Sequence, residues 1–141
     1  MDGLLTPEGE PRSAWWVYKS YTDGVSSRVS SATSNPSLVA LASRRGSAPE
    51  TAQVLLGYFS YRDSPSRINA EVNMKHVSVL PFIQGANSVR VKIELIPDTL
   101  EDSTKGLKLI SNDPAPVSND SVQFVIPNFN VDEAYLVTIS R

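Results

Sequence analysis

The sequence contains no cysteine and a single histidine, His76. Structural disulfides, thiolate chemistry and cysteine-ligated zinc are therefore excluded, and a cluster of histidine ligands cannot form. His76 lies in an alternating segment without distinctive neighbours, which favours a structural or surface role over a Ser-His-Asp arrangement. The acidic residues show no EF-hand or zincin spacing, so we expect no metal and no other cofactor.

Long hydrophobic runs and a strong charge imbalance are also missing. The longest apolar run is far too short to span a membrane, and the opening residues, MDGLLTPEGEP, lack the basic and apolar regions of a signal peptide. The net charge of −2 and the pI of about 5.3 give no support for nucleic acid or an anionic membrane as a partner. No Gly-rich phosphate loop is present either.

An apolar stripe with helical spacing runs through the segment PRSAWWVYKSYTDG near the start of the chain. The stripe follows positions i, i+3, i+4 and i+7 and consists of Ala14, Val17, Tyr18 and Tyr21. Pro11 suits the first turn of a helix, and Gly24 suits the residue after its end. Trp15 and Trp16 widen the stripe, so we predict a helix over residues 11–23 with a broad apolar surface.

From Val25 onward the period changes to the alternation of strands. In SVRVKIELIP, one face holds Val89, Val91, Ile93 and Leu95, and the other holds Arg90, Lys92 and Glu94. Residues 97–106 are predicted to form an exposed loop. About eight such strands, separated by turns and not by helical patterns, favour an antiparallel β-sandwich over a parallel α/β sheet.

The predicted fold class is therefore all-β, a sandwich of about eight strands preceded by one N-terminal helix. A chain of 141 residues suffices for one such domain without a disulfide or metal. Two parts are expected: an N-terminal segment and helix, residues 1–24, and a β-sandwich, residues 25–141.

Fifteen acidic residues are present, most of them in predicted turns or on solvent-facing strand positions. Glycoside hydrolysis requires two facing carboxylates, and the pattern favours solvated surface charge instead. A small enzyme with a carboxylate pair that meets only in the folded chain stays open at this point.

Aromatic residues offer a second kind of site, because a sugar ring can stack on Trp and Tyr faces. Tyr58, Tyr61 and Trp16 are the candidates for carbohydrate contact, although packing in the core or at a strand edge is the more common use of such residues. Asn119-Asp120-Ser121 is an N-x-Ser glycosylation motif in a predicted turn. Alone it proves nothing about modification.

The opening stretch, GLLTPEGEPRSAWWVYKSYTDG, resembles the last helix of a (β/α)₈-barrel glycoside hydrolase of the retaining, clan-A type, where the chain enters a C-terminal β-sandwich. LVALAS, AQVLLGYFS, VRVKIELIP and VQFVIPNFNVDEAYLVTIS resemble strands of that sandwich. A barrel needs about 250 residues, so the resemblance implies an accessory domain without the catalytic carboxylates. It implies no enzymatic activity for this chain.

The resemblance also implies partners. The helix would face a glycoside hydrolase barrel, present in the same protein or lost by truncation, through Trp15, Trp16, Tyr18 and Tyr21. Without a barrel, the helix would either fold back on the sandwich or mediate self-association. The leading interpretation is a secreted, non-catalytic domain that braces a catalytic barrel and contacts carbohydrate. The alternative is a free-standing carbohydrate-binding module that binds polysaccharide through exposed aromatic residues.

Overall fold

The computed structural model describes residues 3–24, 27–46, 50–59, 65–100 and 102–141. Its elements in chain order are α1 (Ser13–Gly24), β1 (Ser27–Val29), β2 (Leu38–Arg45), β3 (Thr51–Tyr58), β4 (Arg67–Lys75), the 3₁₀ turn η1 (Val77–Val79), β5 (Ser88–Ile96), β6 (Lys108–Ser118), β7 (Ser121–Asn130) and β8 (Ala134–Ser140). All the pairings among these strands are antiparallel. The predicted all-β fold, with eight antiparallel strands behind one helix, is confirmed.

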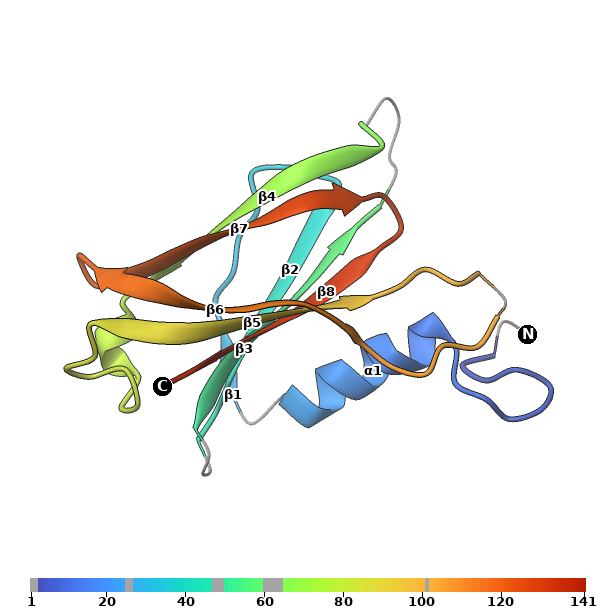
Figure 1. Ribbon diagram of the computed structural model, residues 1–141, viewed down its shortest axis with the longest axis horizontal. Coiled ribbons are helices and arrows are strands. Elements are labelled where there is room, and N and C mark those ends of the chain that lie inside the picture. The colour runs from blue at the N-terminus through green and yellow to red at the C-terminus, as the bar shows by residue number, and fades with distance from the viewer. Residues whose placement is uncertain (1–2, 25–26, 47–49, 60–64, 101) are drawn as a thin grey trace.

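The strands form a strongly curled sheet in the order β1-β2-β3-β8-β5-β6-β7-β4. β6 pairs with β5 along most of its length, and its last two residues, Val117 and Ser118, begin the hairpin to β7. In Figure 1, β4 and β7 lie on one side of the curled sheet and α1 lies on the other. The two layers of the predicted sandwich are therefore parts of one sheet joined at β6.

The inner face of the curled sheet holds the core. Alternate residues of β3, β5, β7 and β8 point into it, as the strand period requires. The core includes Val54, Leu56, Tyr58, Val91, Ile93, Val122, Ile126, Phe129, Val137 and Ile139. Val77, Leu80 and Ile83 from the η1 region close one end. Phe129 lies between two tyrosines, with ring centroids 5.9 Å from Tyr58 and 4.6 Å from Tyr135.

Helix α1 packs across the outer face, where it contacts β2, β3 and β5. Its last residue, Gly24, is buried against the sheet and accepts a hydrogen bond from Ser43 Oγ at 3.1 Å. A Cβ at Gly24 would lie 2.1 Å from Gln53 Oε1, so a larger residue would force the Gln53 side chain to move. The helix thus folds back on its own sheet, which is one of the two arrangements expected from the sequence.

Three details differ from the sequence-based prediction. The helix begins at Ser13, because Pro11 forms a bridge to Leu5. The strand that contains Lys75 ends there, since His76 takes a left-handed backbone with φ 56° and a 3₁₀ turn follows. β6 runs through Pro114 and Pro116, a region with the composition of a turn.

Candidate functional site

The first half of α1 is fixed to the irregular segment that follows β5. Trp16 Nε1 donates to Thr104 O at 2.9 Å, and the position of a Cβ on Gly106 lies 3.5 Å from the Trp16 ring. Trp15 meets Trp16 edge to face at 4.7 Å, and Lys19 Nζ lies 5.7 Å from the Trp15 ring centroid. Both tryptophans are half-buried within their own chain. Trp16 therefore links the helix to this segment, whereas the described contacts of Trp15 lie within the helix.

The second half of α1 borders an apolar groove. We call this the α1 groove; its volume is about 380 Å³ and it is lined by Val17, Tyr18, Tyr21, Val39, Ala40, Leu41, Leu55, Leu56, Gly57 and Ala134. Tyr18 is 61% exposed, Val39 54% and Tyr21 41%. Such a contiguous exposed apolar surface usually marks an interaction site. Arg28 of β1 lies over the Tyr21 ring, with its Cζ 4.3 Å from the ring centroid.

The backbone of β3 shapes the floor of the α1 groove. A Cβ on Gly57 would lie 3.2 Å from Val39 Cγ2, so glycine allows the Val39 side chain to lie close over the strand. Leu38, Ala40 and Ala42 of β2 pack against the core, while Val39 and Leu41 of the same strand face the groove. The alternation of apolar residues along β2 separates these two faces, but Val39 and Leu41 were not predicted as site residues. The available signal was that β2 is apolar on both faces, which is typical of a strand covered on both sides.

The loop after β5 is tied to the start of α1. Ser13 Oγ donates to Pro97 O at 2.5 Å and accepts from the Thr99 amide at 3.2 Å. Asp98 Oδ1 accepts from the Leu100 amide at 3.0 Å. Leu100 has φ 53° and is 83% exposed, an unfavourable backbone for a large apolar residue. The loop was predicted to be exposed. No pattern in the sequence indicated that Leu100 would face outward with a left-handed backbone.

The candidates for carbohydrate contact do not form a common surface in the part of the chain that the structure describes. The Tyr58 ring is 1% exposed, and its hydroxyl donates to Pro65 O at 2.5 Å. Tyr58 therefore cannot stack on a sugar in this fold, because it points to the core face of β3. Tyr61 lies outside the described residues, and Trp16 is half-buried against the loop.

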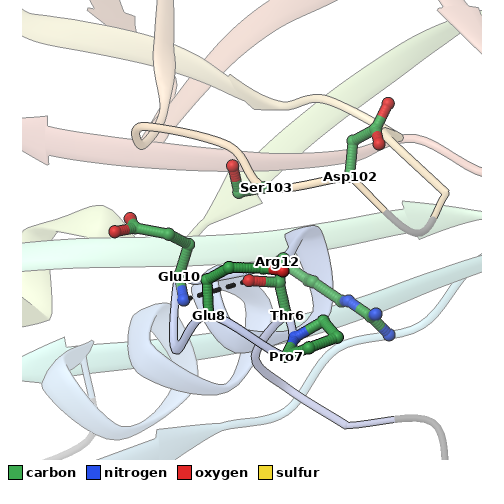
Figure 2. A pocket seen from close by; sticks show the side chains of 7 residues that line it. All are labelled: Thr6, Pro7, Glu8, Glu10, Arg12, Asp102 and Ser103. Atoms are coloured by element: carbon green, nitrogen blue, oxygen red, sulfur yellow. Dashed lines mark hydrogen bonds between the residues drawn. The ribbon is translucent and has the colours of Figure 1, made fainter.

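A second, polar hollow lies between the N-terminal segment and the loop after β5 (Figure 2). It has a volume of about 410 Å³ and is lined by Thr6, Pro7, Glu8, Glu10, Arg12, Asp102 and Ser103. The Glu10 amide donates to Thr6 Oγ1 at 3.2 Å, but the carboxylates of Glu10 and Asp102 extend in opposite directions in Figure 2. These two acids therefore do not face a common substrate as a hydrolytic pair requires.

His76 does meet an acid, although no pattern in the sequence indicated it. Its Nδ1 lies 3.5 Å from Asp120 Oδ2, and the other Asp120 oxygen accepts from the Ser78 amide at 2.7 Å. That backbone hydrogen bond lowers the pKa of Asp120, and so do a hydrogen bond with the Ser78 side chain and the charge of His76. The His76 side chain is 85% exposed. The arrangement ties the β6–β7 turn to η1 and has the character of a structural link.

Tyr135 is the other ionisable group with a shifted pKa. Burial, and then the nearby charge of Glu133, raise the pKa of Tyr135 to about 12. Its phenol is therefore protonated near neutral pH, and Tyr135 is part of the hydrophobic core. Among the described residues, no group of three or more His, Asp or Glu side chains is placed to hold a metal ion. None of the described helices is long and apolar enough to cross a membrane.

Comparisons with known proteins place this fold within larger chains. No family model and no curated protein matches the sequence. A solved protein from Neocallimastix frontalis superimposes with a TM-score of 0.81 and 21% identity, over 98% of this chain and 32% of that chain. A GH39 enzyme from Xanthomonas axonopodis pv. citri matches with a TM-score of 0.62 and 16% identity, again over 98% of this chain and 32% of that chain.

A third match is a xyloglucanase of glycoside hydrolase family 44 from Paenibacillus polymyxa, with a TM-score of 0.52 and 15% identity, over 91% of this chain and 22% of that chain. This chain thus spans about a third or less of the solved chains it matches. At these identities the matches establish a shared fold. The predicted likeness to a β domain found within glycoside hydrolases is confirmed at that level.

Proposed function

We propose that this chain is a non-catalytic accessory domain that packs against the catalytic domain of a glycoside hydrolase. The observation that carries the proposal is the α1 groove, an exposed apolar surface on a domain whose fold recurs as a minor part of glycoside hydrolase chains. The remaining two thirds or more of such chains is the partner that would cover the surface. The role is structural: burial of Tyr18, Tyr21 and Val39 at the contact would stabilise both domains.

The groove is suited to a protein partner more than to a sugar. Its lining is apolar, and it carries few of the hydrogen-bonding side chains that hold sugar hydroxyls. A carbohydrate ligand would need polar partners beside each stacked ring, because unpaired hydroxyls are costly to bury. Carbohydrate contact, secretion and self-association through α1 stay predictions.

The proposal is tested by supplying this chain in trans to truncated enzymes. The Neocallimastix frontalis, Xanthomonas axonopodis and Paenibacillus polymyxa proteins are each produced without the segment that matches this chain. We expect this chain to raise the melting temperature or the soluble yield of at least one of them, and each protein's own segment serves as the positive control. The proposal fails if the native segments rescue their proteins and this chain rescues none.

Variants test whether the rescue depends on the α1 groove or on nonspecific hydrophobic association. Tyr18→Ser combined with Tyr21→Ser should abolish the rescue, because it removes the exposed rings that border the groove. Val79→Ser is the matched control, since Val79 is 64% exposed on η1 and does not line the groove. Equal loss in both variants would contradict a specific surface. The isolated chain should show no turnover on aryl glycosides or polysaccharides.

A further inference from the structure

The tip of the β6–β7 hairpin carries the glycosylation motif Asn119-Asp120-Ser121. Asn119 and Asp120 form the two-residue connection between Ser118 and Ser121, with φ 49° and 57°. This is the conformation of a tight hairpin turn with both central residues left-handed, which Asn and Asp adopt more readily than other non-glycine residues. The motif therefore lies at the tip of the hairpin, the orange turn between β6 and β7 in Figure 1.

We propose that Asn119 is an N-glycosylation site, occupied when the chain passes through a eukaryotic secretory pathway. The carboxamide nitrogen of Asn119 forms a bond to C1 of an oligosaccharide carried on a lipid diphosphate. The bond between C1 and the diphosphate oxygen breaks, the nitrogen loses one proton, and the lipid diphosphate leaves. This inference is independent of the docking proposal.

The native fold accepts a glycan at this position. Asn119 is exposed, and among the described contacts its carboxamide takes part in no hydrogen bond. Its neighbour Asp120 provides the structural links instead: its carboxylate accepts from the Ser78 amide and its carbonyl accepts from the Val77 amide at 3.2 Å. Substituting the Asn119 side chain nitrogen with sugar therefore costs no native interaction.

The described hydrogen bonds of this turn to the neighbouring η1 are made by Asp120, which accepts from the Val77 and Ser78 amides. The α1 groove involves α1, β2, β3 and the start of β8, so the hairpin tip contributes no residue to it.

The folded hairpin indicates when the modification occurs. Ser121, the third residue of the motif, is half-buried, and its hydroxyl donates to Ser118 O at 2.8 Å. That hydroxyl is part of the acceptor motif and is engaged in the native turn. Transfer therefore precedes closure of the hairpin.

The chain supplies an internal control for the test. Asn35-Pro36-Ser37 has the same first and third residues, but proline at the middle position blocks acceptance. Asn35 Oδ1 also accepts from the Ser37 amide at 2.9 Å, and Ser37 is 1% exposed. Asn119 should therefore account for all N-linked sugar on the chain.

The experiment is secretion of the full chain from yeast behind a cleavable signal sequence, followed by mass spectrometry before and after peptide N-glycosidase treatment. We expect a glycan on Asn119 that is lost in Asn119→Asp and in Ser121→Ala, and retained in Ser121→Thr. Asn119→Asp keeps a residue that tolerates the left-handed turn, so loss of the glycan will not reflect misfolding. A wild-type product at the polypeptide mass, or a glycan that persists in both variants, would overturn the proposal.

A second readout tests whether the native fold tolerates the sugar. The glycosylated and enzymatically deglycosylated proteins should unfold at the same temperature, because the Asn119 carboxamide makes no hydrogen bond with the residues that the structure describes. A lower melting temperature of the glycosylated form would contradict an exposed Asn119 side chain that the fold does not use.

Discussion

Two groups of aromatic rings on opposite faces of the same sheet are buried to different extents. Tyr58, Phe129 and Tyr135 meet on the inner face and are almost completely buried. Tyr18 and Tyr21 lie on the helix that covers the outer face and remain 61% and 41% exposed. The inner face is closed by the curl of the sheet itself, whereas one helix covers only part of the outer face. An interaction partner is therefore expected at the outer face, where the rings are only partly buried.

The largest effect should come from the centre of the inner group. Phe129→Ala removes a fully buried ring between two tyrosines, and we expect a loss of about 3–5 kcal/mol in unfolding free energy. Urea unfolding followed by tryptophan fluorescence measures it. A loss below about 1 kcal/mol would mean that the two layers are not held together by this core.

A smaller effect is expected from Tyr58→Phe. The ring remains, but the hydrogen bond from its hydroxyl to Pro65 O is lost and a carbonyl is left without that partner. We expect a loss of about 1 kcal/mol in the same unfolding experiment. Tyr18→Phe is the matched control and should leave the unfolding free energy unchanged, which would separate the buried hydroxyl from the exposed one.

The outer tyrosines should contribute little to the isolated chain. Tyr18→Ser combined with Tyr21→Ser should lower the unfolding free energy by no more than about 1 kcal/mol in total, because Tyr18 is 61% exposed and Tyr21 is 41% exposed with Arg28 as its neighbour. Binding of an apolar fluorescent dye should fall in the same variant. A large loss of stability would show that these rings complete the fold and are not reserved for a partner.

The smallest effect concerns the link between η1 and the β6–β7 turn. In this link the Asp120 carboxylate accepts a hydrogen bond from the Ser78 amide, and this bond is the main cause that lowers the pKa of Asp120. The carboxylate therefore contributes stability that is fully present above the unfolded pKa of about 3.9 and is lost as the pH falls through the lower folded value. Asp120→Asn should be less stable than wild type near neutral pH, and the difference should shrink in acid. A difference that grows in acid would contradict the sign.

Much of the fold could be predicted because the local signals agree with it. The alternation in β5 assigns the correct inner face, since Val89, Val91 and Ile93 are buried. The alternation in β2 separates two faces without saying which is inner, and the structure packs Leu38 and Ala40 against the core. In β5 the alternation holds through Leu95, which pairs with Tyr135 of β8 and packs against the core, while Ile96 on the other face is buried as well. The register shift between Ile93 and Glu94 lies in the pairing with β6, where Ile110 has no partner in β5. A β-bulge of this kind has no distinct sequence signature here.

Other features depended on contacts that no local pattern contains. Pro114 and Pro116 suggest a turn, yet β6 continues through them, paired with Arg90 and Ser88 of β5. The proximity of His76 to Asp120 arises because the hairpin turn folds over the end of β4. The sequence left Tyr58 open between packing and carbohydrate contact, because an aromatic residue near a strand end suits either role. The structure buries it on the core face of β3, together with Val54 and Leu56.

Because both layers share β6, the structure indicates which strands separate first when the fold opens locally. Only Val117 and Ser118 of β6 pair with β7, so few backbone hydrogen bonds join β4 and β7 to the rest of the sheet. Amide hydrogens of that outlying pair would exchange with solvent through a hinge-like parting at the hairpin, before those of β3 and β8 at the sheet's centre.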